Sequence, residues 1–226
     1  MNYFAHGRRY VSDPFFLAGT AVPDWLNVVD RKIRARSRNA QLLINDSDPH
    51  CSATARGIIQ HHQDDHWFHR TEAFATLSLQ LTREIRDFLE PDDGLRCHFL
   101  GHILVEILLD STLIETHPEQ LEDYYNAMLQ VDGDSVAQTV SRISGCNSTG
   151  LAWLIPRFIE ERFLWDYPLD DKLLIRLNQV MQRVKLAALP EGFIDLLPGA
   201  RRAIRQRADE LLSPEGVLGK QPAKPS

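Results

Sequence analysis

The sequence predicts an all-α fold, arranged as a single compact multi-helix domain with a metal site between helices. Apolar residues recur at helical spacing along most of the chain, and the alternating patterns of strands are scarce. The 226 residues, 43% of them hydrophobic and 25% charged, suffice for one substantial core. We therefore expect one domain over residues 1–212. Residues 213–226 contain Pro, Gly and Lys with little to bury, and we expect a flexible tail there.

Each expected helix follows from an apolar stripe with helical spacing. The predicted helices cover Pro14–Leu17 with an extension towards Val22, Trp25–Arg36, Thr54–Asp65, Thr71–Leu89, Gly94–Glu115, Pro118–Val131, Asp134–Ser144, Leu151–Arg162, Asp170–Leu186 and Pro198–Leu212. The segments Ile44–Ser52 and Ser144–Gly150 are rich in turn-forming residues and are expected to be loops.

Three of these helices begin with a recognisable signal. Thr71 precedes Glu72 and is suited to cap the helix that follows. Pro118 suits a first helical turn, where its missing N–H costs nothing. Asp170 opens an apolar pattern and marks a further helix start.

Composition and charge exclude several classes of protein. The net charge of −6 argues against a protein whose main task is to bind nucleic-acid phosphates. Cys51, Cys97 and Cys146 are widely spaced and form no Cys-x-x-Cys motif, as is usual in a reducing compartment. The N-terminus lacks the apolar segment of a signal peptide, and no run approaches the roughly 18 apolar residues that span a bilayer. We expect a cytoplasmic protein without a membrane span or a nucleic-acid partner.

Two stretches place possible metal ligands four residues apart. On an α-helix this spacing brings side chains onto one face, where imidazole and carboxylate groups can approach a shared point. The candidates are His61, Asp65 and His69 in the first stretch and His98, His102, Glu106 and Asp110 in the second. In the first stretch, the four-residue step from His61 predicts that Asp65 faces the site and Asp64 faces away.

Helix geometry limits which members of the second stretch can share an ion. Each step of four residues rises about 6 Å and turns the side chain by about 40°, so His98 and Asp110 cannot meet at one ion. His102 and Glu106 form the favoured pair, although the sequence does not decide whether His98 or His102 faces the site. Large apolar neighbours predict a buried segment, in which a carboxylate needs a metal, arginine or histidine opposite.

Two further candidate ligands lie near the N-terminus. His6 follows the apolar run Tyr3, Phe4 and Ala5, which would carry it inside. Asp24 follows Pro23, which fixes the backbone, and a small-residue turn that ends in an acid suits a carboxylate aimed inward. An equally favoured role for Asp24 is to cap a helix that begins at the next residue. The two roles are compatible.

Four segments, taken in order, form a recognisable pattern: MNYFAH, LAGTAVPDWL, GIIQHHQDD and CHFLGHILVE. In order and spacing they resemble the acyl carrier protein phosphodiesterase family, a divergent branch of the HD-domain metal-dependent phosphohydrolases, over about the first half of the chain. The resemblance implies an HD-domain-like helical fold. It places His6 and Asp24 on the family's N-terminal His and DF acid, His61 and Asp65 on its HRxID motif, and His98 on its HFL motif. The chain is also similar to the zinc-dependent phospholipase C type of helical hydrolase.

The chain departs from that family's pattern at four positions. His62 stands in place of Arg, His69 in place of an acid, Thr20 in place of Asn, and Cys97 in place of the Asp before HFL. The change at Cys97 leaves three outcomes open. They are a different metal, a transfer of the ligand role to His102 and Glu106, and loss of the family's reaction.

The favoured hypothesis is a metal-dependent phosphodiesterase or phosphohydrolase. Imidazole and carboxylate ligands suit one or two ions of Zn(II), Mn(II) or Fe(II), which activate water and stabilise charge on a phosphoryl oxygen. His62 or His66 is a candidate to protonate the leaving oxygen, with a solvated surface position as the alternative. The expected substrate is a small phosphorylated molecule or a phosphopantetheine-type carrier. Two other classes stay open: a non-catalytic helical metal-binding or interaction module, and a di-iron oxidative enzyme.

Overall fold

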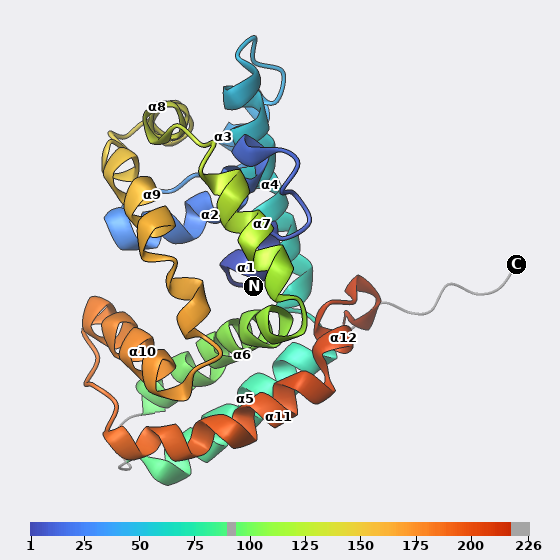
Figure 1. The fold of residues 1–226 in the computed structure, drawn as a ribbon, viewed down its shortest axis with the longest axis vertical. Helices are drawn as coiled ribbons and strands as arrows, with labels where there is room; N and C mark the ends of the chain where they lie inside the picture. Colours follow the sequence, from blue (N-terminus) through green and yellow to red (C-terminus); the bar gives the residue numbers. More distant parts are fainter. Residues whose placement is uncertain (90–93, 218–226) are drawn as a thin grey trace, which may run out of the picture. The chain divides into compact units, whose positions relative to one another are not determined.

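The structure, a computed structural model, describes residues 1–89 and 94–217. Within these residues all regular structure is helical, and the single β-type pairing is an isolated bridge between Thr71 and Val217 (Figure 1). The predicted all-α class is therefore confirmed for the described part of the chain.

The α-helices differ widely in length, and short 3-10 helices (η) join several of them. The α-helices are α1 (Tyr3–Gly7), α2 (Pro14–Val29), α3 (Ser37–Ala40), α4 (Pro49–Phe68), α5 (Glu72–Phe88), α6 (Gly94–Thr116), α7 (Pro118–Met128), α8 (Gly133–Ser144), α9 (Gly150–Glu161), α10 (Asp170–Val184), α11 (Leu197–Gln206) and α12 (Ala208–Leu211). The 3-10 helices are η1 (Gln41–Leu43), η2 (Phe163–Asp166), η3 (Glu191–Leu196) and η4 (Pro214–Gly216).

The chain divides into two compact units. Unit 1 comprises Met1, Asp65–Thr112 and the described residues from Pro168 onwards, and unit 2 comprises Asn2–Asp64 and Leu113–Tyr167. The boundaries fall inside α4 and α6, so each of these helices contributes to both units. The expectation of one domain over residues 1–212 stays a prediction.

In unit 2, α2 is longer than its sequence pattern predicts. The Asp13 carboxylate caps it by accepting a hydrogen bond from the Phe16 amide at 3.1 Å. The helix then runs through Pro23 to Val29, so the predicted break before Trp25 is wrong. The helix predicted over Trp25–Arg36 is confirmed only as far as Val29. A proline inside a helix costs about 3 kcal/mol, but α2 buries most of its side chains, and that burial offsets the cost.

The interior position of Pro23 also changes the role of Asp24. Because α2 has already begun at Pro14, Asp24 lies in its third turn and cannot cap a helix there. The prediction that Asp24 caps a new helix is therefore wrong.

A close approach of α2 and α4 positions one part of the candidate site. A Cβ atom added at Gly57 would lie 2.8 Å from the Cα atom of Gly19, and one added at Gly19 would lie 2.9 Å from the Cα atom of Gly57. Only glycine permits two backbones to come this near. The contact brings the backbone carbonyl of Thr20 next to the face of α4.

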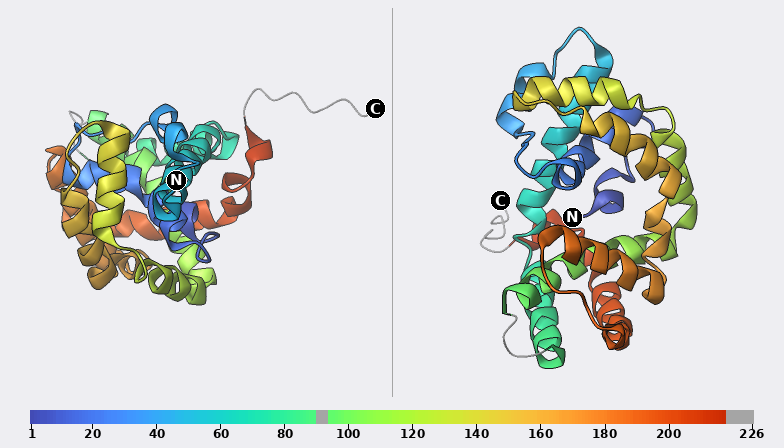
Figure 2. Two further views of the ribbon diagram at one scale, coloured as in Figure 1. Left: turned by 90° about the horizontal axis from the view of Figure 1, so that it is seen from above. Right: turned by 90° about the vertical axis from the view of Figure 1, so that its left-hand side faces the viewer.

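The first turn of α4 lies in a segment that the sequence pattern predicts to be a loop. The Asp48 carboxylate accepts a hydrogen bond from the His50 amide at 2.9 Å, and Pro49 takes the first helical position. The loop prediction for Ile44–Ser52 is therefore wrong from Pro49 onwards. Elsewhere in unit 2, α8 packs along α9 (Figures 1 and 2), and Gly145 ends α8 in the left-handed conformation.

In unit 1, α5 begins as its sequence signal predicts. The Thr71 hydroxyl oxygen accepts a hydrogen bond from the Phe74 amide at 3.2 Å and donates to the carbonyl of Phe68 at 2.9 Å. The apolar stripe of α5 is buried, and α6 packs closely on it: a Cβ atom added at Gly101 would lie 2.7 Å from the carbonyl oxygen of Ser78. This contact fixes the part of α6 that carries His102.

By length and composition, one helix among the described residues could cross a membrane. It is the Arg96–Thr116 part of α6, whose most apolar window has a mean hydropathy of 1.5 and is 72% buried. Polar side chains such as His102, Glu106 and Asp110 interrupt this segment, so it is not a continuous run of apolar residues. Burial of this kind is usual for a core helix, and the absence of a membrane span stays a prediction.

The expected C-terminal tail is described only in part. Pro214–Gly216 form η4, and Val217 pairs with Thr71. Residues 218–226 lie outside the described residues, as do residues 90–93 at the predicted end of Thr71–Leu89 and start of Gly94–Glu115.

Candidate metal centres

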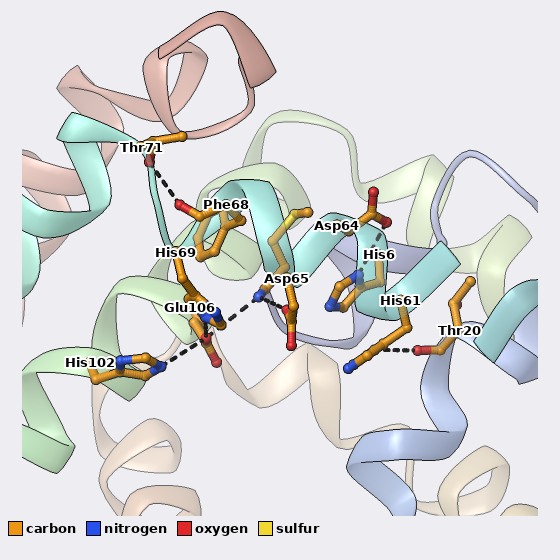
Figure 3. A network of polar contacts seen from close by, with 11 residues as sticks. His6, Thr20, His61, Asp64, Asp65, Phe68, His69, Thr71, His102 and Glu106 are labelled. Carbon is orange, nitrogen blue, oxygen red and sulfur yellow. Dashed lines mark hydrogen bonds and ion pairs between the residues drawn. The ribbon is translucent and has the colours of Figure 1, made fainter. Parts of the chain in front are cut away.

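Helix α4 carries residues of both candidate metal-binding groups at or near its C-terminal end. His61 and Asp65 lie one turn apart on it, Asp64 lies between them, and His69 follows the last residue of the helix (Figure 3). Two groups of His and carboxylate residues with the spacing of metal ligands involve these positions. This confirms that the described residues hold candidate metal-binding groups.

The first group contains the two most deeply buried histidines of unit 2. The rings of His6 and His61 stack with centroids 4.2 Å apart and an interplanar angle of 27°. His61 donates through Nδ1–H to the Thr20 carbonyl at 2.8 Å, because a carbonyl oxygen can only accept. His6 Nδ1 lies 3.3 Å from the Asp64 carboxylate oxygen Oδ2.

These two contacts set which nitrogen each ring offers to a metal. A neutral imidazole that donates through Nδ1–H presents the lone pair of Nε2 on the opposite side of its ring. In metal sites, the ring N–H that does not bind the metal usually donates to a carbonyl or carboxylate oxygen of this kind. We call this acceptor the outer partner of the histidine. His6 and His61 are thus held in the form that a metal site requires.

Asp65 completes this first group. Ligand atoms of His6, His61 and Asp65 all lie within 4.8 Å of one another. Asp65 lies one turn beyond His61 on the same continuous helix, α4, and this helix fixes the position of Asp65 relative to His61. Asp65 also accepts a hydrogen bond from the amino group of Met1 at 2.8 Å.

The second group lies wholly in unit 1 and consists of His69, His102 and Glu106. His69 Nε2 lies 2.7 Å from Glu106 Oε1, and His102 Nε2 lies 3.3 Å from the same oxygen. The amino group of Met1 lies 3.5 Å from it as well. Three nitrogen atoms thus converge on one carboxylate oxygen (Figure 3).

The surroundings of Glu106 keep its carboxyl group charged. Burial by itself raises the pKa of this carboxyl group, but the amino group of Met1 and the hydrogen bonds from His102 and His69 together outweigh burial. The pKa of Glu106 therefore lies well below its ordinary value. A carboxylate in this state is available to bind a cation.

One aromatic ring borders both histidines of the second group. The Phe74 ring is edge-on to His69 at a centroid distance of 4.8 Å and to His102 at 4.9 Å. Phe68 packs against Phe74 at 5.0 Å. The two imidazoles are therefore held from one side by buried rings from the end of α4 and the first turn of α5.

Two predicted ligands lie outside both groups. Asp24 is half-buried inside α2, and His98 is exposed on α6, one turn before His102. Neither belongs to a group of converging ligand atoms among the described residues. On α6 it is His102 that joins such a group, and a ligand role for Asp24 or His98 stays a prediction.

The two histidines proposed for proton transfer have hydrogen-bond partners of their own. His62 donates through Nε2–H to the Ala35 carbonyl at 2.7 Å. His66 is exposed, and its Nε2 atom lies 3.1 Å from Arg70 Nη1. A catalytic role for either residue stays a prediction.

Sequence reasoning missed several residues that shape these groups. Asp64 was expected to face away, but it contacts His6, because positions three apart share a helix face as well as positions four apart. The carbonyl of Thr20 and the ring of Phe74 approach through tertiary packing and leave no local signal. A search for acids at both three and four residues from His61 would have found Asp64.

No protein-family model matches the chain, and comparisons with curated proteins and with solved structures find no match. The resemblance to acyl carrier protein phosphodiesterases therefore stays a prediction.

Proposed function

We propose that this protein is a metal-dependent hydrolase of phosphoesters, with His6, His61 and Asp65 as ligands of its catalytic metal ion. The observation that carries the proposal is the orientation of the two imidazoles. Both Nδ1 atoms face oxygen acceptors, which favours Nε2 as the atom that binds an ion. Ligand atoms of the two rings and of Asp65 lie within 4.8 Å of one another.

The donor set fits such an ion. Two neutral imidazoles and one carboxylate make the three-ligand set common in catalytic zinc sites, and they also suit Mn(II) and Fe(II). Three protein ligands leave a coordination position for water or substrate. The two buried rings and their outer partners would hold the ligands in place before the ion binds.

The chemistry expected of the site divides between the ion and the chain. A bound divalent ion would lower the pKa of a water molecule and stabilise charge on a phosphoryl oxygen. Asp64 and the Thr20 carbonyl orient His6 and His61, and the deep burial of these rings limits water around them. His66 is exposed, whereas His62 donates to the Ala35 carbonyl, so His66 is the more accessible of the two proposed proton donors.

The substrate class follows from the sequence resemblance alone. We propose a small phosphodiester or a phosphopantetheine-type carrier.

A second candidate function is a non-catalytic helical module. The observation that favours it is that the polar groups satisfy one another without an ion: Asp65 pairs with the amino group of Met1, and Glu106 accepts from His69. A buried polar network of this kind can serve stability alone. In that case substitutions would lower stability and change no reaction.

Turnover of a generic phosphodiester distinguishes the two candidates. The full chain, supplied in turn with zinc, manganese and iron, is assayed with bis(p-nitrophenyl) phosphate. We expect His61→Ala and Asp65→Asn to reduce turnover to background, while His117→Ala, at an exposed position on the N-terminal side of α7, retains it. Absence of turnover by the wild-type chain with all three metals would reject the hydrolase.

A further inference from the structure

We infer that His69, His102 and Glu106 bind a second divalent metal ion of the zinc class, at an open site with no ligand in common with the catalytic centre proposed above. All three residues belong to unit 1: His69 lies in the turn between α4 and α5, and the other two lie on α6. The inference stands whether or not the first group is catalytic.

The spacing of the ligand atoms supports an ion. Bonds of about 2.0–2.1 Å at tetrahedral angles place the ligand atoms of a zinc ion about 3.3 Å apart. His102 Nε2 and Glu106 Oε1 have that separation, at 3.3 Å, and His69 Nε2 lies 2.7 Å from the same oxygen. The distance from His69 Nε2 to Glu106 Oε1 must increase only slightly to fit an ion. Rotation of the partly exposed His69 side chain can provide this increase.

The residue types and their exposure indicate an open site. Two imidazoles with one glutamate are a ligand set of catalytic rather than structural zinc sites. The side chains of His69, His102 and Glu106 are 30%, 41% and 16% exposed, so the group faces solvent on one side. Water or an anion can occupy the remaining coordination position.

The backbone supports the group from two directions. His102 and Glu106 are one turn apart on α6, which holds them on one face. On the other side, Phe74 contacts both histidines, and its own amide is bonded to the hydroxyl of Thr71. Ligands held on well-packed elements lose little freedom when an ion binds.

The residues also lie where the chain departs from the family pattern it resembles. His69 replaces an acid of that pattern, and His102 and Glu106 come after its HFL motif. The second ion is therefore inferred from the contacts of this chain and not from the resemblance.

The test counts zinc ions on the full chain. Protein stripped with a chelator is incubated with excess zinc, freed of unbound metal by gel filtration, and analysed by mass spectrometry for zinc per chain. We expect two ions in the wild type, one in His102→Ala and one in His61→Ala. His98→Ala, which removes an exposed histidine one turn away on the same helix, should keep both.

Two ions remaining in His102→Ala, or an equal loss in His98→Ala, would overturn the inference. Glu106→Gln, which keeps the shape of the side chain, should also retain one ion, and circular dichroism confirms that each variant is folded. A wild-type chain with a single ion lost only in His61→Ala rejects the second site and keeps the first. A single ion lost only in His102→Ala keeps the inference and rejects the proposed catalytic centre.

Discussion

The two candidate groups use the same residue types in opposite ways. His6 and His61 are buried, and their Nδ1 atoms face an outer carboxylate and a backbone carbonyl. His69 and His102 are partly exposed, and both approach Glu106 through Nε2. The two groups therefore differ in their hydrogen bonds. In the first group, the histidines bond through Nδ1 to oxygens outside the ligand set, whereas in the second group the ligands bond to one another.

This difference predicts different costs of metal binding. In the first group, the Nδ1 atoms of both rings already face oxygen acceptors, so each ring has the tautomer in which Nε2 can bind an ion. In the second group, the rings donate to Glu106 through Nε2–H, so each neutral imidazole must move its proton to Nδ1 before Nε2 can bind an ion. Metal binding should therefore be weaker at the second group than at the first.

The substitution expected to distinguish the two groups most strongly is Asp64→Asn. Asp64→Asn weakens the hydrogen bond that orients His6. Loss of such a bond to a metal-binding histidine commonly lowers metal affinity by about 10- to 100-fold. We expect zinc affinity to fall by this amount at the first group only, as measured by competition with a chromophoric chelator.

Asp123→Asn, at an exposed position on α7, is the matched control for this change of charge. If Asp64→Asn binds zinc as Asp123→Asn does, the outer carboxylate plays no part in arranging the first group.

The next effect concerns the close approach of α2 and α4. Gly57→Ala places a Cβ atom 2.8 Å from the Cα atom of Gly19, and overpacking of this kind costs about 1–3 kcal/mol. Because the helices must separate, the Thr20 carbonyl should also move away from His61. We expect a lower free energy of unfolding in urea and a loss of zinc at the first group but not at the second.

Gly199→Ala tests the same substitution in α11, where the nearest atom lies 4.0 Å away on a flexible arginine. Alanine is favoured over glycine inside a helix by about 1 kcal/mol, so this variant should be slightly more stable than the wild type. Equal effects of the two substitutions would contradict the close helix contact.

The smallest effect concerns the charge of Glu106 in metal-free protein. Since its pKa is lower in the folded chain than in the unfolded chain, its carboxylate stabilises the fold above the unfolded pKa of about 4.3. That contribution is lost as the pH falls below this value towards the folded pKa. Glu106→Gln should therefore be less stable than the wild type at pH 7, by about 1–2 kcal/mol.

The measurement is chemical denaturation between pH 3 and pH 7, over which the difference between the two proteins should shrink as the pH falls. A difference that stays constant over this range would show that the charge of Glu106 does not stabilise unit 1.

Local patterns in the sequence predicted much of the fold. Helical periodicity indicated the all-α class, the cap at Thr71 indicated the start of α5, and the four-residue spacing found the pairs His61–Asp65 and His102–Glu106. These features depend on residues within one or two turns of a helix, where spacing alone fixes which side chains are neighbours.

Features set by tertiary packing could not be predicted in the same way. Burial keeps α2 helical through Pro23, although the local preference is to break. His69 contacts His102, which lies 33 positions away in the chain. His61 bonds to the Thr20 carbonyl, which lies 41 positions away. No local spacing carries that information, and the sequence therefore left the choice between His98 and His102 open.

Elemental analysis of tag-free protein as purified, beside a His61→Ala, Asp65→Ala double variant, tests the central claim most directly. The account predicts stoichiometric zinc, manganese or iron in the wild type and the loss of at least one ion per chain in the variant. Iron with little phosphodiesterase activity would favour the oxidative alternative. Wild-type protein that is free of metal and takes up none when it is added would contradict the account and leave a helical module with a buried polar network.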